Sequence, residues 1–187
     1  PYERHVFKLS PDGGEPTPVT RLPGEHLPVP SPDGSRVALV HSSDTTPPEL
    51  CLVAGDGSEP EQRVTTSPTA GFRDHAWARA RYVTFPSLVD DATLHARILT
   101  PAKLQPGRRY PVLFGPVYSN TVRNRWAGFY GTLQQLLVQK GFIVVQVDVR
   151  GCRDSAVVGN STVLVEGVVT SSHRSPDGVH VRVDLEP

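Results

Sequence analysis

The stretch FIVVQVDV, Phe142–Val149, is a nearly continuous run of apolar and β-branched residues without alternation. A strand that is apolar on both faces is typical of the inside of a parallel sheet covered by helices. A second apolar strand is predicted at Tyr110–Phe114. A segment with helical periodicity separates the two, so residues 110 to 149 are predicted to form a right-handed strand–helix–strand unit.

The segment between these strands predicts a helix over residues 126 to 138 with one apolar face. Its large apolar residues recur at spacings of three and four, at Trp126, Phe129, Tyr130, Leu133, Leu136 and Leu137. Gly141 suits the end of this helix, because glycine readily adopts the left-handed conformation found there.

Upstream of the unit, two shorter strands are predicted as an antiparallel pair. YVTFPSL begins at Tyr82, and an Asp90–Asp91 turn follows it. In TLHARIL, Thr93–Leu99, apolar and polar residues alternate as in a half-exposed strand, with Leu94, Ala96 and Ile98 on one face and Thr93, His95 and Arg97 on the other.

The first eighty residues carry short apolar stretches, VFKL, RVALV and ELCLV, that turn motifs separate. The turn tetrapeptide SPDG occurs at Ser10–Gly13, at Ser31–Gly34 and again at Ser175–Gly178. DGGEP at Asp12–Pro16 is followed 44 residues later by DGSEP at Asp56–Pro60. That spacing is typical of β-propeller blades, although two unrelated Asp-Gly turns would give the same pattern.

Composition excludes several classes of protein. The 187 residues contain 19 Lys+Arg and 19 Asp+Glu, so the formal net charge is zero and a nucleic-acid partner is not expected. Nineteen prolines and sixteen glycines disfavour an all-helical fold. Two cysteines, Cys51 and Cys152, are too few for a disulfide framework or a zinc cluster, and no metal or other cofactor is expected.

The sequence gives no localisation. No apolar run reaches the ~20 residues that cross a bilayer, and the first ten residues lack the apolar core of a signal peptide, so a soluble segment is expected. Methionine is absent even from position 1, which predicts that the sequence is one piece of a longer product.

The order of these segments resembles the prolyl oligopeptidase family of serine peptidases, and in particular its dipeptidyl peptidase IV branch. The resemblance covers residues 1 to 151 and rests on VTFPSL, the Tyr-Pro-Val strand, Asn124–Trp126 (NRW) and Val147–Gly151 (VDVRG). It implies a mixed β and α/β fold with three parts. Residues 1–80 would be terminal β-propeller blades, 81–151 the start of an α/β-hydrolase domain, and 152–187 an atypical strand-rich tail.

The family hydrolyses peptide bonds with a Ser–Asp–His triad whose serine lies in a Gly-x-Ser-x-Gly turn. No serine of this chain fits that pattern; Ser161 comes nearest, with Gly159 before it but Val163 in the place of the second glycine. None of the seven histidines is predicted to pair with such a serine. Asp148 is expected to close the end of its strand rather than to act as a catalytic acid.

These features predict a fragment of a serine oligopeptidase or dipeptidyl peptidase that is inactive by itself, the intact relative acting on peptides. The alternative is a non-catalytic binding module. Self-association through exposed sheet edges is expected in the isolated chain. One catalytic element is implied by the resemblance: Tyr118, in VLFGPVYSN, as a donor to the oxyanion. Aligning on Gly115–Pro116 would place Phe114 there instead and remove the hydroxyl.

Overall fold

The computed structural model describes residues 2–87, 92–115 and 122–148. The chain divides into two compact units, the first made of residues 1–79 and 123–135 and the second of residues 80–122 and those from 136 onward. The tail from residue 152 lies outside the described residues. It includes the third SPDG sequence and Gly159–Val163.

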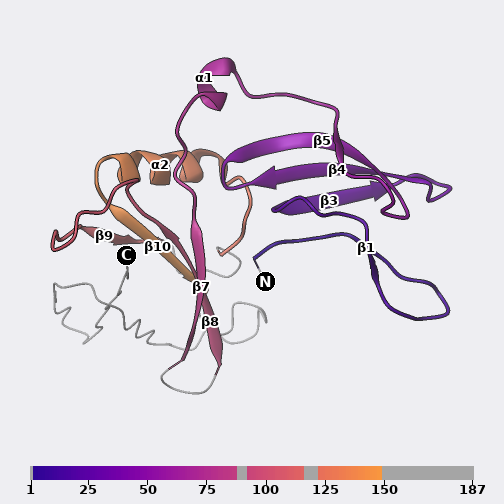
Figure 1. The fold of residues 1–187 in the computed structure, drawn as a ribbon, viewed down its shortest axis with the longest axis horizontal. Coiled ribbons are helices and arrows are strands. Elements are labelled where there is room, and N and C mark those ends of the chain that lie inside the picture. The colour runs from indigo at the N-terminus through magenta and orange to yellow at the C-terminus, as the bar shows by residue number, and fades with distance from the viewer. Residues whose placement is uncertain (1, 88–91, 116–121, 149–187) are drawn as a thin grey trace. The chain divides into compact units, whose positions relative to one another are not determined.

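The first unit is built on a four-stranded antiparallel sheet in the order β3-β4-β5-β6 (Figure 1). Its strands are β3 (Glu25–Pro30), β4 (Arg36–Ser43), β5 (Thr46–Ala54) and β6 (Gln62–Arg63). A smaller sheet pairs β1 (Phe7–Lys8) with β2 (Thr17–Pro18), and a single turn of helix, α1 (Ala70–Arg73), follows.

The predicted SPDG turn at Ser31–Gly34 connects β3 to β4. Gly34 has a φ of +69°, and its backbone N–H donates to the carbonyl of Ser31 at 2.9 Å. The sequence analysis did not predict β3 as a strand, because EHLPVP contains two prolines. Pro28 and Pro30 are accommodated because β3 lies at the end of the sheet order, where a missing backbone N–H costs no ladder bond.

This sheet is apolar on both faces. Alternate residues of β4 and β5 pack with Val19 into a core of Val19, Val37, Leu39, Cys51 and Val53. On the other face, Leu27, Val40 and Leu50 lie opposite one another across three strands, and all three are exposed. A neighbouring row, Val29, Ala38 and Leu52, extends this face.

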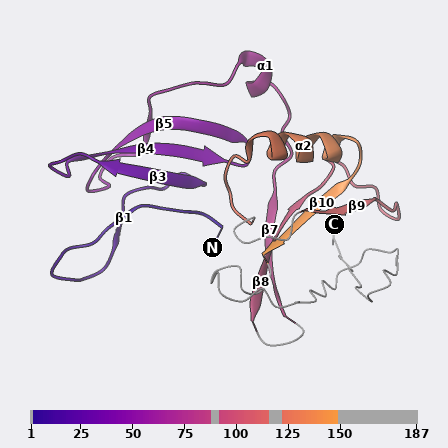
Figure 2. The same cartoon turned by 180° about the vertical axis from the view of Figure 1, so that it is seen from behind.

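The second unit contains a mixed sheet in the order β7-β8-β10-β9 (Figure 2). Its strands are β7 (Arg81–Pro86), β8 (Thr93–Leu99), β9 (Val112–Phe114) and β10 (Ile143–Asp148). β7 and β8 form the predicted antiparallel pair, and β9 and β10 form the predicted parallel pair. β10 is buried from Ile143 to Val147, as its sequence predicts, although its other neighbour, β8, runs antiparallel.

The predicted alternation along β8 is wrong at Arg97. Its side chain is only 5% exposed, and its guanidinium donates to Gln146 Oε1 at 2.7 Å on the adjacent strand β10. A buried cation requires such a partner, and Gln146 supplies it from within the sheet.

The helix α2 (Gly128–Gln139) joins β9 to β10, and Gly141, with a φ of +90°, follows its end as predicted. Most of its predicted apolar face is exposed: Phe129 and Tyr130 are 77% and 70% exposed, and Leu133 and Leu136 are also exposed, whereas Leu137 is half-buried. The helix buries Gln134, Gln135 and Val138 instead.

Gln135 explains part of this orientation of α2. Its side-chain amide accepts from the N–H of Ala78 at 2.9 Å and donates to the Ala78 carbonyl at 2.8 Å. An extended backbone beside the helix needs polar partners, which a leucine at this position could not supply.

The described residues confirm a β-rich mixed α/β fold, and they include no closed propeller. Neither helix in this part of the chain has the length and apolar character required to cross a bilayer.

Candidate functional site

The catalytic residue suggested by the sequence, Tyr118, lies outside the described residues. The competing residue, Phe114, is the last residue of β9, and its neighbour across the parallel pair is Val145. Asp148 ends β10, and its carboxylate accepts the backbone N–H of Val122 at 3.2 Å. This bond gives Asp148 a backbone partner, as expected for a residue that closes a strand end.

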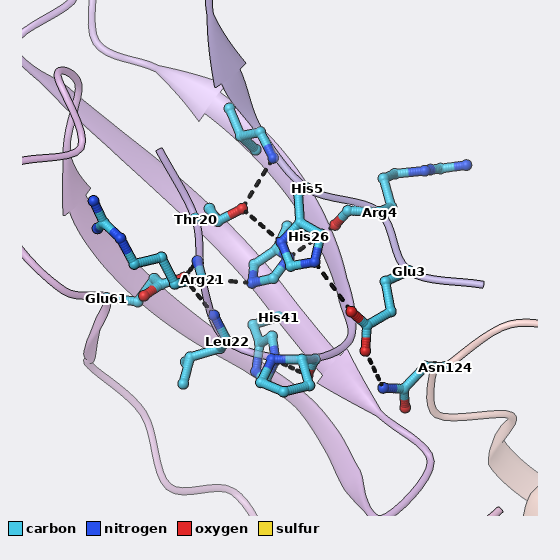
Figure 3. Close-up of polar contacts among 12 residues, drawn as sticks. Glu3, Arg4, His5, Thr20, Arg21, Leu22, His26, His41, Glu61 and Asn124 are labelled. Atoms are coloured by element: carbon cyan, nitrogen blue, oxygen red, sulfur yellow. Dashed lines mark hydrogen bonds and ion pairs between the residues drawn. The ribbon is translucent and has the colours of Figure 1, made fainter. Parts of the chain in front are cut away.

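The first unit brings three histidines together that the sequence analysis treated separately. His26 on β3 and His41 on β4 are directly opposite in the strand register. Ring centroids are 4.8 Å apart for His26 and His41 and 5.2 Å apart for His26 and His5 (Figure 3). We call His5, His26 and His41 the histidine cluster.

Backbone carbonyls fix one protonated nitrogen on each of two rings of the histidine cluster. His26, which is 0% exposed, bonds through Nδ1 to the carbonyl of Arg4 at 2.8 Å. His41 is 5% exposed and bonds through Nε2 to the carbonyl of Pro23 at 3.1 Å. A carbonyl oxygen only accepts, so these ring nitrogens carry the proton. The remaining nitrogens, His26 Nε2 and His41 Nδ1, are buried without a hydrogen-bond partner.

His5 is more exposed and is bonded through both ring nitrogens. Its Nε2 lies 3.2 Å from Glu3 Oε2, and its Nδ1 lies 3.3 Å from the hydroxyl of Thr20. The Thr20 hydroxyl oxygen also accepts the backbone N–H of Val6 at 2.9 Å. These contacts fix His5 both to Glu3 of its own segment and to Thr20, which follows β2.

A buried carboxylate lies next to the histidine cluster. Glu61 Oε1 is 3.8 Å from His26 Nε2, and it accepts the backbone N–H groups of Arg21 and Leu22 (Figure 3). Burial alone would raise the pKa of Glu61, but the N–H groups of Leu22 and Arg21 outweigh burial and lower the pKa, with His26 adding to this effect. Glu61 is therefore a stable anion beside a neutral ring.

Gly24 is required for this arrangement. Its φ is +139°, and a Cβ there would lie 2.2 Å from the carbonyl oxygen of Ser42 and 3.0 Å from His41 Nε2. Any other residue would push the chain away from β4 and break the contact with His41.

The sequence contained the information that places two of these histidines together. Once Ser31 and Arg36 close the turn, with the N–H of Ser31 donating to the carbonyl of Arg36 at 2.8 Å, residues at equal distances from this pair lie opposite each other, and five residues away on either side these are His26 and His41. The position of His5 depends on a segment that bridges to β3 only through Arg4 and Glu25, and no local pattern predicts it.

The histidine cluster is not a metal centre in this structure. Among the described residues, no three His, Cys, Asp or Glu side chains are arranged to hold a metal ion. The rings contact one another tilted by 34° and 37°. The chemistry that a histidine cluster of this kind supports is the binding and release of protons.

Comparisons with known proteins give a consistent relationship. Residues 90–173 match the X-Pro dipeptidyl-peptidase family (S15 family). Two fungal proteins described as probable dipeptidyl-aminopeptidase B, from Aspergillus clavatus and Emericella nidulans, are each 30% identical over 81% of this chain. The chain spans only 17% of the length of either relative.

The fold has a counterpart among solved structures. The crystal structure of dipeptidyl peptidase 4 from Porphyromonas gingivalis matches 80% of this chain with a TM-score of 0.63 and 22% identity, and the match covers 21% of that protein. At this identity the likeness concerns the fold alone. The sequence matches show that this chain is similar to dipeptidyl peptidases, and the structural match shows a similar fold.

Proposed function

We propose that this chain is part of a serine dipeptidyl peptidase of the prolyl oligopeptidase type, which cleaves peptides only when the remaining sequence is present. The parallel pair β9 and β10, joined by α2, carries this proposal. It is a strand–helix–strand unit with a buried strand, as an α/β-hydrolase sheet requires, and it lies within the range that matches the X-Pro dipeptidyl-peptidase family.

The four-stranded sheet of the first unit supports the assignment of this sheet as a propeller blade. A propeller blade is a small antiparallel sheet that packs against a blade on each side, so both of its faces are apolar. The sheet β3-β4-β5-β6 has four antiparallel strands, a core on one face, and an exposed apolar face at Leu27, Val40 and Leu50. The 44-residue spacing of its Asp-Gly turns fits the same assignment.

The position of Tyr118 supports its proposed role as oxyanion donor. In open α/β sheets, ligands bind at the carboxyl ends of the parallel strands. β9 ends at Phe114, so Tyr118 follows that end after three intervening residues, and β10 ends next to it at Asp148. A tyrosine four residues after β9 is therefore close in sequence to where a hydrolase builds its site.

The chain itself is proposed to be inactive, because no serine in its 187 residues lies in a Gly-x-Ser-x-Gly turn. The test is hydrolysis of a proline-containing dipeptide anilide by the purified chain and by a longer product that carries the triad. Only the longer product is expected to turn the anilide over, and a serine-directed phosphonate should stop it. Phosphonate-sensitive turnover by the 187-residue chain would refute the proposal.

The role of Tyr118 is tested in the longer product. Tyr118→Phe is expected to lower kcat by about 10²–10³ with little change in KM, the usual cost of losing one oxyanion donor. Phe114→Leu serves as the matched control and should leave kcat within a few fold. An unchanged kcat for Tyr118→Phe would refute the proposed role of Tyr118 as oxyanion donor.

A further inference from the structure

We propose that the histidine cluster is a proton-sensitive catch for the N-terminal segment Tyr2–Val6. With neutral rings the segment is bound to the edge of β3, and protonation at mildly acidic pH releases it together with its contacts to Asn124. This inference is independent of peptide hydrolysis, because every contact on which it depends lies within the first unit.

One carbonyl group joins the segment to the histidine cluster. The carbonyl of Arg4 accepts both the backbone N–H of His26, at 3.1 Å, and its Nδ1–H, at 2.8 Å. In return, the N–H of Arg4 donates to the carbonyl of Gly24 at 3.1 Å. These bonds form an isolated bridge, not a full strand pairing, so few interactions hold the segment to β3, whereas its end at Val6 is bonded separately to Val19 and Thr20. A change at His26 therefore acts directly on its attachment.

A second proton on either buried ring creates an N–H group that has no hydrogen-bond partner. Protonated His26 would present an N–H at Nε2, and protonated His41 would present one at Nδ1, and neither atom has a hydrogen-bond partner. An unpaired buried donor is costly, and more so when it is charged. The short separations between His26 and the other two rings add repulsion between like charges. Separation of the segment, which carries His5, relieves both costs by admitting water.

The ionisable surroundings of the rings do not remove these costs. Burial has the largest effect on the pKa of His26 and lowers it. The Arg4 carbonyl and Glu61 raise this pKa, whereas His41 and His5 lower it, and the net result is a lowered pKa. The oxygen of Glu61 nearest to His26 is already occupied by two backbone N–H groups and lies 3.8 Å away. Release is therefore expected to begin below the ordinary histidine value of 6.5.

The other charged groups on the packed elements are engaged elsewhere. Glu49, opposite His41 on β5, accepts from Thr65 and Ser67, and Glu25 on β3 forms an ion pair with Arg4 at 3.7 Å. Glu3 is bonded to His5, so protonation of His5 strengthens a contact within the segment itself and does not hold the segment to β3.

Release has a defined consequence for Asn124. Its backbone N–H donates to the carbonyl of Tyr2 at 2.8 Å, and its side-chain amide donates to Glu3 Oε1 at 3.0 Å. The oxygen of the Asn124 side-chain amide accepts the backbone N–H of Asp44 at 3.0 Å. Asn124 lies four residues before α2, so separation of Tyr2–Val6 removes two of the bonds that fix the chain entering this helix.

Amide hydrogen exchange of the full chain between pH 7.5 and 5.5 tests this catch. After correction for the intrinsic pH dependence of exchange, protection of the Arg4, His26 and Asn124 amides is expected to fall about tenfold at pH 5.5, the change given by one ring that stays neutral when closed and titrates normally when released. Amides in the middle of β4 and β5 should lose less. Equal protection of the three amides at both pH values would overturn the proposal.

Variants separate the catch from general acid sensitivity. His41→Phe keeps a ring but removes one of the two histidine charges that lower the pKa of His26, so the pH response of the Arg4 and Asn124 amides should shrink. His75→Gln, an exposed histidine outside the cluster, is the control and should keep the full response. The same response in both variants would overturn the proposal.

A measurement on the unmodified chain covers the case in which His41→Phe does not fold. In an NMR titration of the imidazole signals, the His26 ring is expected to take up its proton below pH 6.5, over the range in which the Asn124 amide signal shifts. Protonation of His26 without any change at Asn124 would also count against the catch.

Discussion

Replacement of Leu39 by alanine tests whether one face of the β3-β4-β5-β6 sheet forms the core of the first unit. Leu39 is 0% exposed, lies opposite Cys51 in the register, and packs in the cluster with Val19, Val37 and Val53. Leu39→Ala removes three carbon atoms at ~0.8 kcal/mol each and leaves a cavity, so a loss of about 3–4 kcal/mol in the free energy of unfolding is expected. This corresponds to a change of about two to three orders of magnitude in the folded-to-unfolded ratio.

Urea denaturation followed by tryptophan fluorescence measures this loss, because Trp77 and Trp126 both belong to the first unit. Val40→Ala is the matched control: Val40 is the next residue on β4 and lies on the exposed face. It should cost less than about 1 kcal/mol. Equal losses for Leu39→Ala and Val40→Ala, or a loss below about 1 kcal/mol for Leu39→Ala, would refute the assignment of the two faces.

Three further measurements follow from single residues. Burial raises the pKa of Glu49, but hydrogen bonds from Thr65 and Ser67 outweigh it and the net pKa is below 4.5. The unfolded state then binds more protons, so stability is lost as pH falls below 4.5, and Glu49→Gln should be less stable at pH 7 and lack this acid dependence in urea denaturation. Serine hydrogen bonds lower the pKa of Asp33 to about 2, and an NMR titration should find its midpoint there rather than near 4. Val29→Lys, on the exposed apolar face, should reduce self-association in sedimentation velocity, and an unchanged profile would exclude this face as the contact.

Local patterns predicted the elements that local chemistry decides. The run from Ile143 to Val147 is buried because four of its five residues are apolar and β-branched and lie on both faces of the strand, and the sequence alone shows this. Gly34 in the SPDG turn and Gly141 after α2 adopt positive φ values, as the turn and the helix end require. The parallel pairing of β9 with β10 follows from the helix between them.

Contacts between residues far apart in the sequence determined the features that local patterns did not predict. The three-and-four spacing of α2 shows which residues share a face, but not which face is covered, and the covered face contains Gln134 and Gln135. Arg97 is buried because Gln146, far along the chain, accepts its N–H. The association of His5 with His26 likewise depends on a bridge to β3 that no periodicity encodes.

The histidine cluster and the exposed apolar residues lie on opposite faces of the sheet in the first unit. His26 and His41 share the buried face with Leu39, whereas Leu27 and Val40 occupy the opposite, exposed face. If a neighbouring blade covers the exposed face in the longer protein, it gains apolar contacts there and leaves the surroundings of the rings unchanged. A proton-sensitive catch on the buried face should then survive assembly of the propeller. Covering Leu27 and Val40 should raise the stability of the sheet, while the pH at which Tyr2–Val6 separates from β3 should stay the same.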